Sequence, residues 1–292
     1  MDFKQKFEPN DNKIIHGAGQ SFEAFSKYWD AVDNYKPIIY MTYAKIPKIT
    51  QWIEKIKIES KKFPGLMLQI GLKLLDSEGK DKTGDILKGK YDKDLNEFFR
   101  TIKELGNPTF IRIGYEFDKK GKYDPVRFVK CWKYLVDMYR KEKINNIATV
   151  WCACPFNGTE PVEKYYPGDD YVDWFGVDVF FPRHFKDNKY KPVEDFLQLA
   201  KKHKKPVMIG ESTPAKIGVD KGQKSWDEWF KLYFKWIHAH PIIKAFCYIN
   251  WNWGVDYKTP EWGNCRIETN EVVRKRLVKE LSNSVYINNK KR

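Results

Sequence analysis

Two glutamates of this sequence each follow a short, largely apolar segment with the composition of a buried strand. Glu116 follows residues 111–115, and Glu211 follows residues 207–210. Each glutamate is therefore expected at the carboxyl end of a strand. If both strands belong to one parallel barrel, these ends share one face. Two carboxylates converging there would supply the acid and the nucleophile that cleavage of a glycosidic bond needs.

The position of Arg112 suggests which glutamate is the nucleophile and which is the acid/base. It lies four residues before Glu116 and, by strand alternation, on the same face as Gly114 and Glu116. Its guanidinium group could keep a neighbouring carboxylate ionised, which suits a nucleophile. We therefore assign Glu211 as the nucleophile and Glu116 as the acid/base, whose proton must be held by burial and by the opposite negative charge. Gly114 is expected to leave room for a ligand or a neighbouring side chain.

Aromatic side chains near the predicted carboxyl ends would stack on the apolar faces of a sugar ring. Trp251 and Trp253 come at the end of the eighth apolar segment, and Trp151 ends the fifth. Trp251 is predicted on the interior face of its strand. Its ring would then stack under the sugar that is cleaved.

Polar side chains at the same ends would bind sugar hydroxyl groups. His16 and Gln20 are expected after the first strand, and Asp178 at the end of the sixth. The predicted substrate-binding residues are Arg112, Tyr115, His16, Gln20, Trp151, Asp178, Trp251 and Trp253.

Eight strands alternating with helices would position these residues. Segments with strand composition occur at 13–16, 37–43, 66–72, 109–116, 147–152, 172–180, 206–211 and 244–251. Segments with helical spacing of apolar residues occur at 21–34, 50–62, 93–105, 125–143, 193–203, 226–238 and 272–281, while 161–166 is expected to be a short irregular crossover. The alternation predicts an α/β fold, a (β/α)8 TIM barrel. We expect one domain over residues 1–292, with a tail at 284–292.

Charge and cysteine content narrow the possible partners. The net charge is +14, but only nine of the 53 basic residues are Arg and the Lys residues are scattered. Because a phosphate site needs forked Arg contacts and a clustered basic stripe, no nucleic-acid partner is expected. The cysteines, five in number, are expected as buried thiols. Cys152 and Cys154, with five His in the whole chain, give no metal-ligand spacing.

The sequence has no apolar run of membrane-spanning length, and its first dozen residues lack the hydrophobic core of a signal peptide. We therefore expect no membrane partner. A native Met1 would place the protein in the cytoplasm, whereas a trimmed leader would place it outside the cell or at its surface. A monomer is expected.

The residues singled out above resemble glycoside hydrolase clan A and, within it, family 26. The resemblance extends over nearly the whole chain and is carried by Arg112 four residues before Glu116, by the segment 166–178, by the turn 210–212 and by Trp251. Members of that family are (β/α)8 enzymes, mainly β-mannanases with some β-xylanases and mixed-linkage glucanases. The resemblance implies a retaining double displacement without a cofactor.

Two positions depart from the family pattern. Tyr115 stands where the family has His before the acid/base, and Phe180 stands where it has a Tyr that hydrogen-bonds the nucleophile. Tyr115 or Tyr43 could supply an equivalent hydroxyl group. The resemblance implies an endo-acting hydrolase of a β-mannan-type polysaccharide, with a β-1,3- or mixed-linkage glucanase as the alternative. A non-catalytic carbohydrate-binding barrel would keep the tryptophans but would need neither strand-end glutamate.

Overall fold

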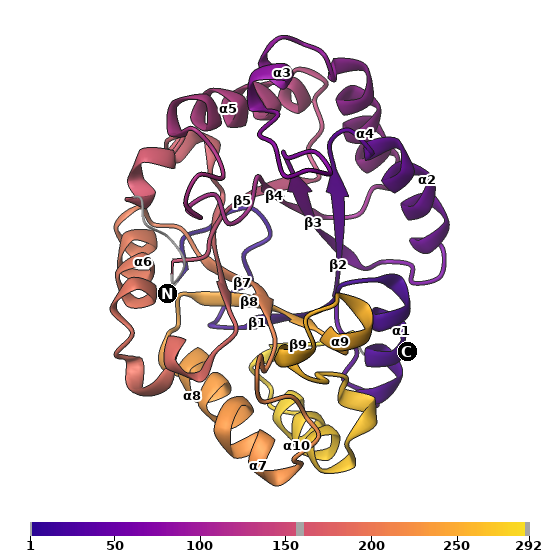
Figure 1. Cartoon of the computed structure of the whole chain (residues 1–292), viewed down its shortest axis with the longest axis vertical. Helices are drawn as coiled ribbons and strands as arrows, with labels where there is room; N and C mark the ends of the chain where they lie inside the picture. The colour runs from indigo at the N-terminus through magenta and orange to yellow at the C-terminus, as the bar shows by residue number, and fades with distance from the viewer. Residues whose placement is uncertain (1, 156–160, 290–292) are drawn as a thin grey trace. The chain divides into compact units, whose positions relative to one another are not determined.

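The computed structural model of the chain describes residues 2–155 and 161–289. The chain forms two compact units: a terminal unit, residues 1–41 with 177–292, and a central unit, residues 42–176. Along the chain, strands β1 to β8 alternate with helices, and the strand order is that of a (β/α)8 barrel (Figure 1). The predicted fold class is therefore confirmed.

The strands are β1 Ile14–Gly19, β2 Ile39–Lys45, β3 Met67–Lys73, β4 Thr109–Ile113, β5 Ile147–Ala153, β6 Trp174–Val179, β7 Val207–Ser212, β8 Ile243–Ile249 and β9 Tyr286–Ile287. The α-helices are α1 Phe22–Ala31, α2 Ile49–Glu59, α3 Thr83–Leu87, α4 Asp92–Leu105, α5 Pro125–Lys141, α6 Lys191–Lys202, α7 Gln223–Ser225, α8 Lys231–Ala239, α9 Trp253–Asp256 and α10 Glu271–Leu281. A π-helical turn, Trp226–Phe230, joins α7 to α8.

All eight predicted strands are present, although several of their ends differ from the prediction. β1 runs to Gly19, three residues beyond its predicted end, whereas β4 and β8 stop at Ile113 and Ile249. The predicted tail contains a short strand, β9, which pairs with β1. The crossover after β5 has two 3-10 turns, Val162–Tyr165 and Asp169–Tyr171, in its described part, as expected of an irregular connection.

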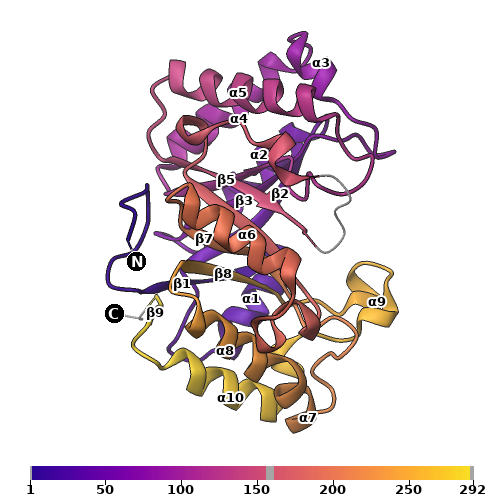
Figure 2. The same ribbon diagram turned by 90° about the vertical axis from the view of Figure 1, so that its left-hand side faces the viewer.

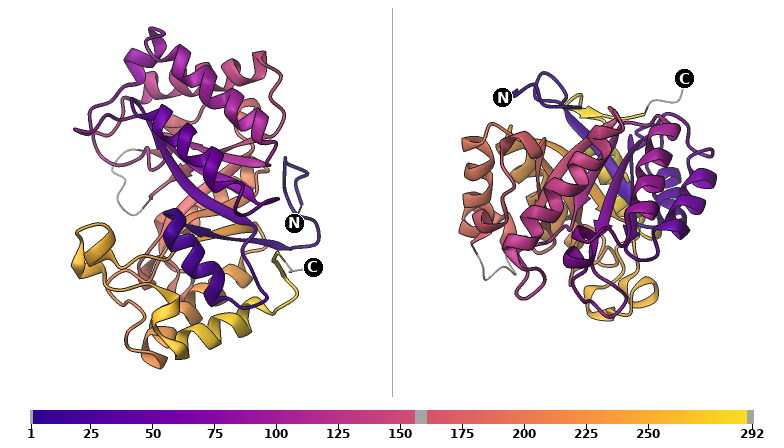
Figure 3. Two further views of the ribbon diagram at one scale, coloured as in Figure 1. Left: turned by 90° about the vertical axis from the view of Figure 1, so that its right-hand side faces the viewer. Right: turned by 90° about the horizontal axis from the view of Figure 1, so that it is seen from above.

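In the central unit, β3, β4 and β5 form a parallel sheet in register, with Ile111 of β4 opposite Ile70 of β3 and Thr149 of β5. Helices α2, α4 and α5 cover one face of this sheet (Figures 1 and 3). The cover is apolar because α4 buries Leu95, Phe98, Phe99 and Ile102 on one side of an otherwise charged helix.

In the terminal unit, β7, β8, β1 and β9 are parallel neighbours, and β1 also pairs with the first half of β2. Helices α8 and α10 lie side by side against these strands (Figure 2), and a hydrogen bond of 2.7 Å joins His238 to Glu280 between them. β1 needs glycine here, since a Cβ on Gly17 would lie 2.6 Å from the Cys247 sulfur and one on Gly19 would lie 2.4 Å from the Met41 oxygen.

The five cysteines are all buried and free, as predicted. Across the described ranges, no helix combines the length and the apolar character that crossing a membrane requires.

Candidate active site

Glu116 lies on a sharp turn after β4, not on the strand itself. Strand β4 ends at Ile113, and both Gly114 and Glu116 have left-handed backbone conformations, with φ of 55° and 53°. The Gly114 amide donates to Leu72 of β3 at 2.8 Å, and the Glu116 amide donates to Cys152 of β5 at 2.7 Å. The backbone thus changes its hydrogen-bonding neighbour within two residues. A left-handed non-glycine residue at this point is a strained conformation of the kind found at functional sites.

This turn decides between the two expectations for Gly114, which were room for a ligand or room for a neighbouring side chain. A Cβ at Gly114 would lie 2.7 Å from the Phe128 ring of α5 and 3.2 Å from Leu74, so neighbouring side chains take up the room. The glycine is therefore needed for its left-handed conformation and for close packing.

Two lysines set the charge state of Glu116. The Lys119 ammonium nitrogen lies 2.5 Å from Glu116 Oε2, and the Glu116 side chain is only 11% exposed. Lys122, which is partly buried, donates to the Tyr115 carbonyl oxygen at 2.6 Å. Burial raises the pKa of Glu116, but Lys119 and Lys122 lower it by more, so that this pKa lies below its ordinary value. We expected burial to raise the pKa of Glu116. Within the central unit, the two lysines lower this pKa by more than burial raises it.

Asp118 fixes the same turn from its other end. Its carboxylate accepts a hydrogen bond of 2.8 Å from the Cys154 backbone amide. Burial above all, with the negative charge of Glu116 adding to it, raises the pKa of Asp118 to about 6. Its second oxygen, Oδ2, is buried without a hydrogen-bond partner. The turn is thus fastened to the end of β5 at both Glu116 and Asp118.

Arg112 lies beneath the turn and is fully buried. Its guanidinium group donates to the Tyr43 hydroxyl oxygen at 3.1 Å and to the Cys152 sulfur at 3.6 Å. The Tyr115 ring lies 4.7 Å from the guanidinium carbon and packs edge-on against Tyr43 at 5.6 Å. A buried cation therefore lies between two tyrosine rings below Glu116.

Glu211 lies on β7, at an irregularity in the ladder. The register of β7 against β8 shifts between Ile209 and Ser212, and such shifts re-aim the side chains they contain. Glu211 itself is 7% exposed. The Ser212 hydroxyl donates to the Cys247 carbonyl at 3.0 Å and accepts from the Tyr233 hydroxyl at 2.9 Å. Buried hydroxyl groups thus fix the strand end next to the carboxylate.

A row of aromatic rings follows β8 in the terminal unit. Trp251 is partly exposed and stacks on Tyr257 at 5.7 Å, with the ring of Trp253 at 5.3 Å on another side. Trp253 is 6% exposed, contacts Trp262 at 4.6 Å, and its indole nitrogen lies 3.5 Å from the Thr213 hydroxyl just after β7. One ring of the row, Trp253, therefore contacts the residue two positions beyond Glu211.

The sequence model of glycosyl hydrolase family 26 matches residues 32–238, well over half of the chain. The chain belongs to glycosyl hydrolase family 26. A β-1,3-xylanase of an Alcaligenes species is 26% identical over 234 residues, which are 70% of this chain and 49% of that protein. The β-1,3-xylanase TXYA of a Vibrio species is 26% identical over 231 residues, covering 70% of this chain and 50% of its own length. The chain spans about half the length of the curated relatives it matches.

Solved structures agree on the fold. A double mutant of the Cellulomonas fimi endo-β-1,4-mannanase has a TM-score of 0.66 at 15% identity, covering 94% of this chain and 72% of that one. The catalytic domain of a Bacillus endo-β-1,4-mannanase has a TM-score of 0.65 at 15% identity, covering 94% of this chain and 87% of that one.

Several predicted binding residues of this family 26 chain are core residues instead. Trp151 is fully buried, stacks on Phe117 at 4.6 Å and donates its indole N–H to the Tyr165 carbonyl. A fully buried ring is not available to a sugar. The prediction failed because the place of Trp151 at a strand end does not show that Phe117, Tyr166 and Phe175 cover its ring.

His16 lies inside β1 rather than after it, and is fully buried. Its ring nitrogens lie 2.8 Å from the Tyr28 hydroxyl and 2.9 Å from the Asn288 side-chain oxygen. Burial lowers the pKa of His16 to about 4, so the ring is neutral at neutral pH. These contacts make His16 a packing residue, and the prediction that it binds a hydroxyl group is not supported.

The other polar residues have different surroundings. Gln20 follows β1, and its side-chain oxygen is buried without a hydrogen-bond partner in the described part of the chain. Asp178 is fully buried near the end of β6. The lysines beside Glu116 were not predicted. Their only signal in the sequence is a spacing of three and six residues from the glutamate, in a chain that is rich in Lys.

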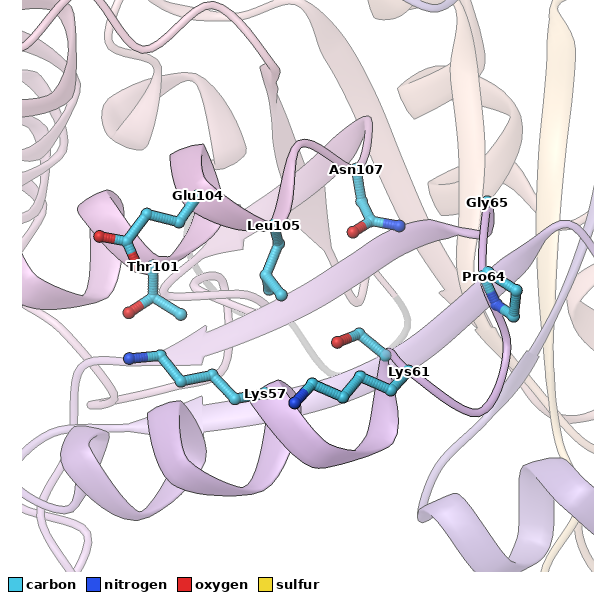
Figure 4. Close-up of a pocket in the computed structure, with 9 residues that line it drawn as sticks. Lys57, Lys61, Pro64, Gly65, Thr101, Glu104, Leu105 and Asn107 are labelled. Atoms are coloured by element: carbon cyan, nitrogen blue, oxygen red, sulfur yellow. The ribbon is translucent and has the colours of Figure 1, made fainter.

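A hollow of about 580 Å³ in the central unit lies elsewhere. It is lined by Lys57, Lys61, Thr101, Glu104 and Asn107 (Figure 4). These residues border the beginnings of β3 and β4, whereas Glu116 follows the end of β4. The hollow is thus not part of the candidate site. Within residues 2–155 and 161–289, no group of three or more His, Cys, Asp or Glu side chains could hold a metal ion.

Proposed function

We propose that the chain is a retaining, endo-acting β-glycoside hydrolase in which Glu211 is the nucleophile and Glu116 the acid/base. The observation that carries the proposal is family membership together with two buried glutamates, each at an irregularity beside the carboxyl end of its strand. Carboxyl ends are where the active sites of (β/α)8 enzymes lie.

In the proposed reaction, the Glu211 carboxylate attacks the anomeric carbon while Glu116 protonates the departing glycosidic oxygen. Glu116 then removes a proton from water, which attacks the glycosyl-enzyme and releases a product of unchanged configuration. This role needs a proton on Glu116 that Lys119 opposes. In our proposal, the glycosidic oxygen displaces the Lys119 ammonium group from Oε2, and the negative charge of the nucleophile then favours the proton.

This mechanism requires the two carboxylates to face one sugar. We expect their oxygens about 5–5.5 Å apart, as retention demands. A crystal structure with a bound glycosyl fluoride would measure the separation. A separation near 9 Å would indicate inversion, and carboxylates on different faces would contradict the proposal.

We propose that the substrate is a β-1,3-linked xylan rather than a β-mannan. Two curated relatives that are 26% identical to this chain over 234 and 231 residues are β-1,3-xylanases, whereas the two mannanases resemble it in fold at 15% identity. A panel of β-1,3-xylan, β-1,4-xylan, β-mannan, β-1,3-glucan and mixed-linkage glucan, assayed for release of reducing ends, would test the choice. If both the wild type and Glu211→Gln bound a glycan and neither released reducing ends from it, a non-catalytic carbohydrate-binding barrel would be favoured.

A further inference from the structure

Two cations share one aromatic ring at the end of the aromatic row. The Arg183 guanidinium carbon lies 4.6 Å from the centre of the Phe181 ring, and the Lys216 ammonium nitrogen lies 5.9 Å from it. Both cationic residues are exposed, and they come from the loops that follow β6 and β7. Because both positive charges lie near one ring, an anion bound beside that ring would be attracted by each of them.

No acidic side chain in residues 2–155 and 161–289 supplies such an anion. Within the described part of the chain, neither Arg183 nor Lys216 has a carboxylate within ion-pair distance. Two partly buried arginines of the terminal unit differ: Arg266 pairs with Asp256 at 2.8 Å, and Arg274 pairs with Asp33 at 3.1 Å. The two cations around Phe181 are therefore open to a charged group from outside.

The cation pair is continuous with the aromatic row. Phe181 packs edge-on against Trp262 at 5.8 Å, and Trp262 contacts Trp253 at 4.6 Å. The Lys216 amide donates to the Trp262 carbonyl at 3.1 Å, which fastens the loop after β7 to the loop after β8. Lys216 is also five residues beyond Glu211 on the same connection. A glycan lying along the row would thus bring a substituent to the two cations.

We propose that Arg183 and Lys216 bind an oxyanion substituent, a carboxylate or a sulfate, carried by the glycan that the enzyme cleaves. The proposal rests on the proposed function and refines it, because it makes the substrate an acidic polysaccharide. The forked donors of Arg183 match the two oxygens of such a group, and Lys216 adds a point charge. The aromatic rings would bind the uncharged sugar on either side.

Derivatives of one polysaccharide that differ only in their substituent show whether the charge or the size of the substituent matters for cleavage. Soluble β-1,3-xylan would carry carboxymethyl, sulfate or hydroxyethyl groups at equal, low substitution. We expect kcat/KM to be about threefold to tenfold higher on the two charged derivatives than on the hydroxyethyl one at low ionic strength. The preference should shrink in 0.5 M NaCl, where screening is within about 4–5 Å. The carboxymethyl and sulfate arms show which anion is bound.

The variants locate the effect. Arg183→Gln with Lys216→Gln should abolish the preference, and Arg183→Lys with Lys216 intact should retain part of it. The matched control is Lys235→Gln with Arg276→Gln, which removes the same charge and the same kind of cation–ring contact, since Arg276 lies 5.9 Å from the Trp226 ring. That control should keep the preference.

Binding by the Glu211→Gln protein, measured as retardation in gels that contain each derivative, separates this proposal from the proposed function. Equal retardation by all three derivatives, or a preference that survives Arg183→Gln with Lys216→Gln, would overturn the anion site. Retardation that depends on the two cations, in a protein that hydrolyses none of the glycans, would keep the anion site and overturn the proposed enzyme.

Discussion

The surroundings of Glu116 and Glu211 differ more than their matching places after apolar strand segments suggest. Glu116 lies on a left-handed turn among Lys119, Lys122 and the buried Arg112. Glu211 lies on β7. The Ser212 and Thr213 hydroxyl groups that follow it fasten the strand end to β8, and the Thr213 hydroxyl also accepts from Trp253. Charged side chains thus lie beside one carboxylate, whereas buried hydroxyl groups fix the strand end beside the other.

The different surroundings of the two glutamates match two different requirements of a retaining mechanism. In the proposed mechanism, the nucleophile must be held rigidly near the anomeric carbon, and the buried hydrogen bonds of Ser212 and Thr213 would hold the strand end that carries Glu211. An acid/base must change its charge twice in each turnover, and nearby movable charges affect how readily it does so. The Lys119 side chain, 39% exposed, is such a movable charge.

The largest expected effect on kcat/KM comes from substituting the two glutamates themselves. Glu211→Gln should lower kcat/KM by more than about 10⁴-fold on both a glycan and an activated aryl glycoside, because both need the nucleophile. Glu116→Gln should lose about 10²–10⁴-fold on the glycan and retain most activity on the aryl glycoside, whose leaving group needs no acid.

Azide provides the control for these roles. It should restore activity to Glu116→Ala and give a β-configured glycosyl azide, detected by NMR. Equal losses on both substrates for both variants would contradict the assigned roles.

The next effect separates two neighbouring tryptophans on the Glu211 side. Trp251→Ala should lower kcat/KM about 10²-fold with little change in melting temperature, because its partly exposed ring is expected under the sugar. Trp253→Ala should instead cost about 3–5 kcal/mol of stability, because its ring is buried against Trp262. Thermal unfolding and kinetics on both variants would check this. A large loss of stability in Trp251→Ala with normal activity of the folded fraction would show that Trp251 is a packing residue.

The third prediction concerns the turn that carries Glu116. Gly114→Ala should cost about 2–4 kcal/mol of stability, because the new methyl group meets Phe128 at 2.7 Å in a left-handed conformation. Gly121→Ala is the matched control: φ is 69° there, but no atom lies within 4 Å, so only about 1 kcal/mol is expected. Chemical denaturation would measure both. Equal losses would mean that packing against Phe128 contributes nothing.

The sequence predicts the periodic parts of this molecule and misses its exceptions. Strand and helix alternation is a property of neighbouring residues, so the eight strands are found. The end of β4 is missed because Arg112, Gly114 and Glu116 still alternate where the backbone has already turned. The burial of His16 depends on Asn288, which is distant in sequence and close only in the fold. Charge–charge contacts such as Lys119 with Glu116 need side-chain geometry that no spacing rule supplies.

The smallest expected effect tests the charge control of Glu116 directly. Lys119 lowers the pKa of Glu116, and the reaction needs Glu116 protonated, so activity should fall as pH rises through that pKa. Lys119→Met should therefore move the alkaline limb of kcat/KM upward by up to about one pH unit, while Lys120→Met, one exposed residue further along, should leave it in place.

The same variant has a consequence for stability, with a definite sign. A folded-state pKa below the unfolded value means that ionised Glu116 contributes stability above the unfolded pKa and loses it as pH falls through the folded one. Lys119→Met should reduce that contribution at neutral pH and make stability less dependent on pH under acidic conditions. Unfolding curves at pH 7 and pH 4 would measure it. An unchanged alkaline limb together with an unchanged acid dependence would show that the ion pair of Lys119 and Glu116 does not control the proposed acid/base.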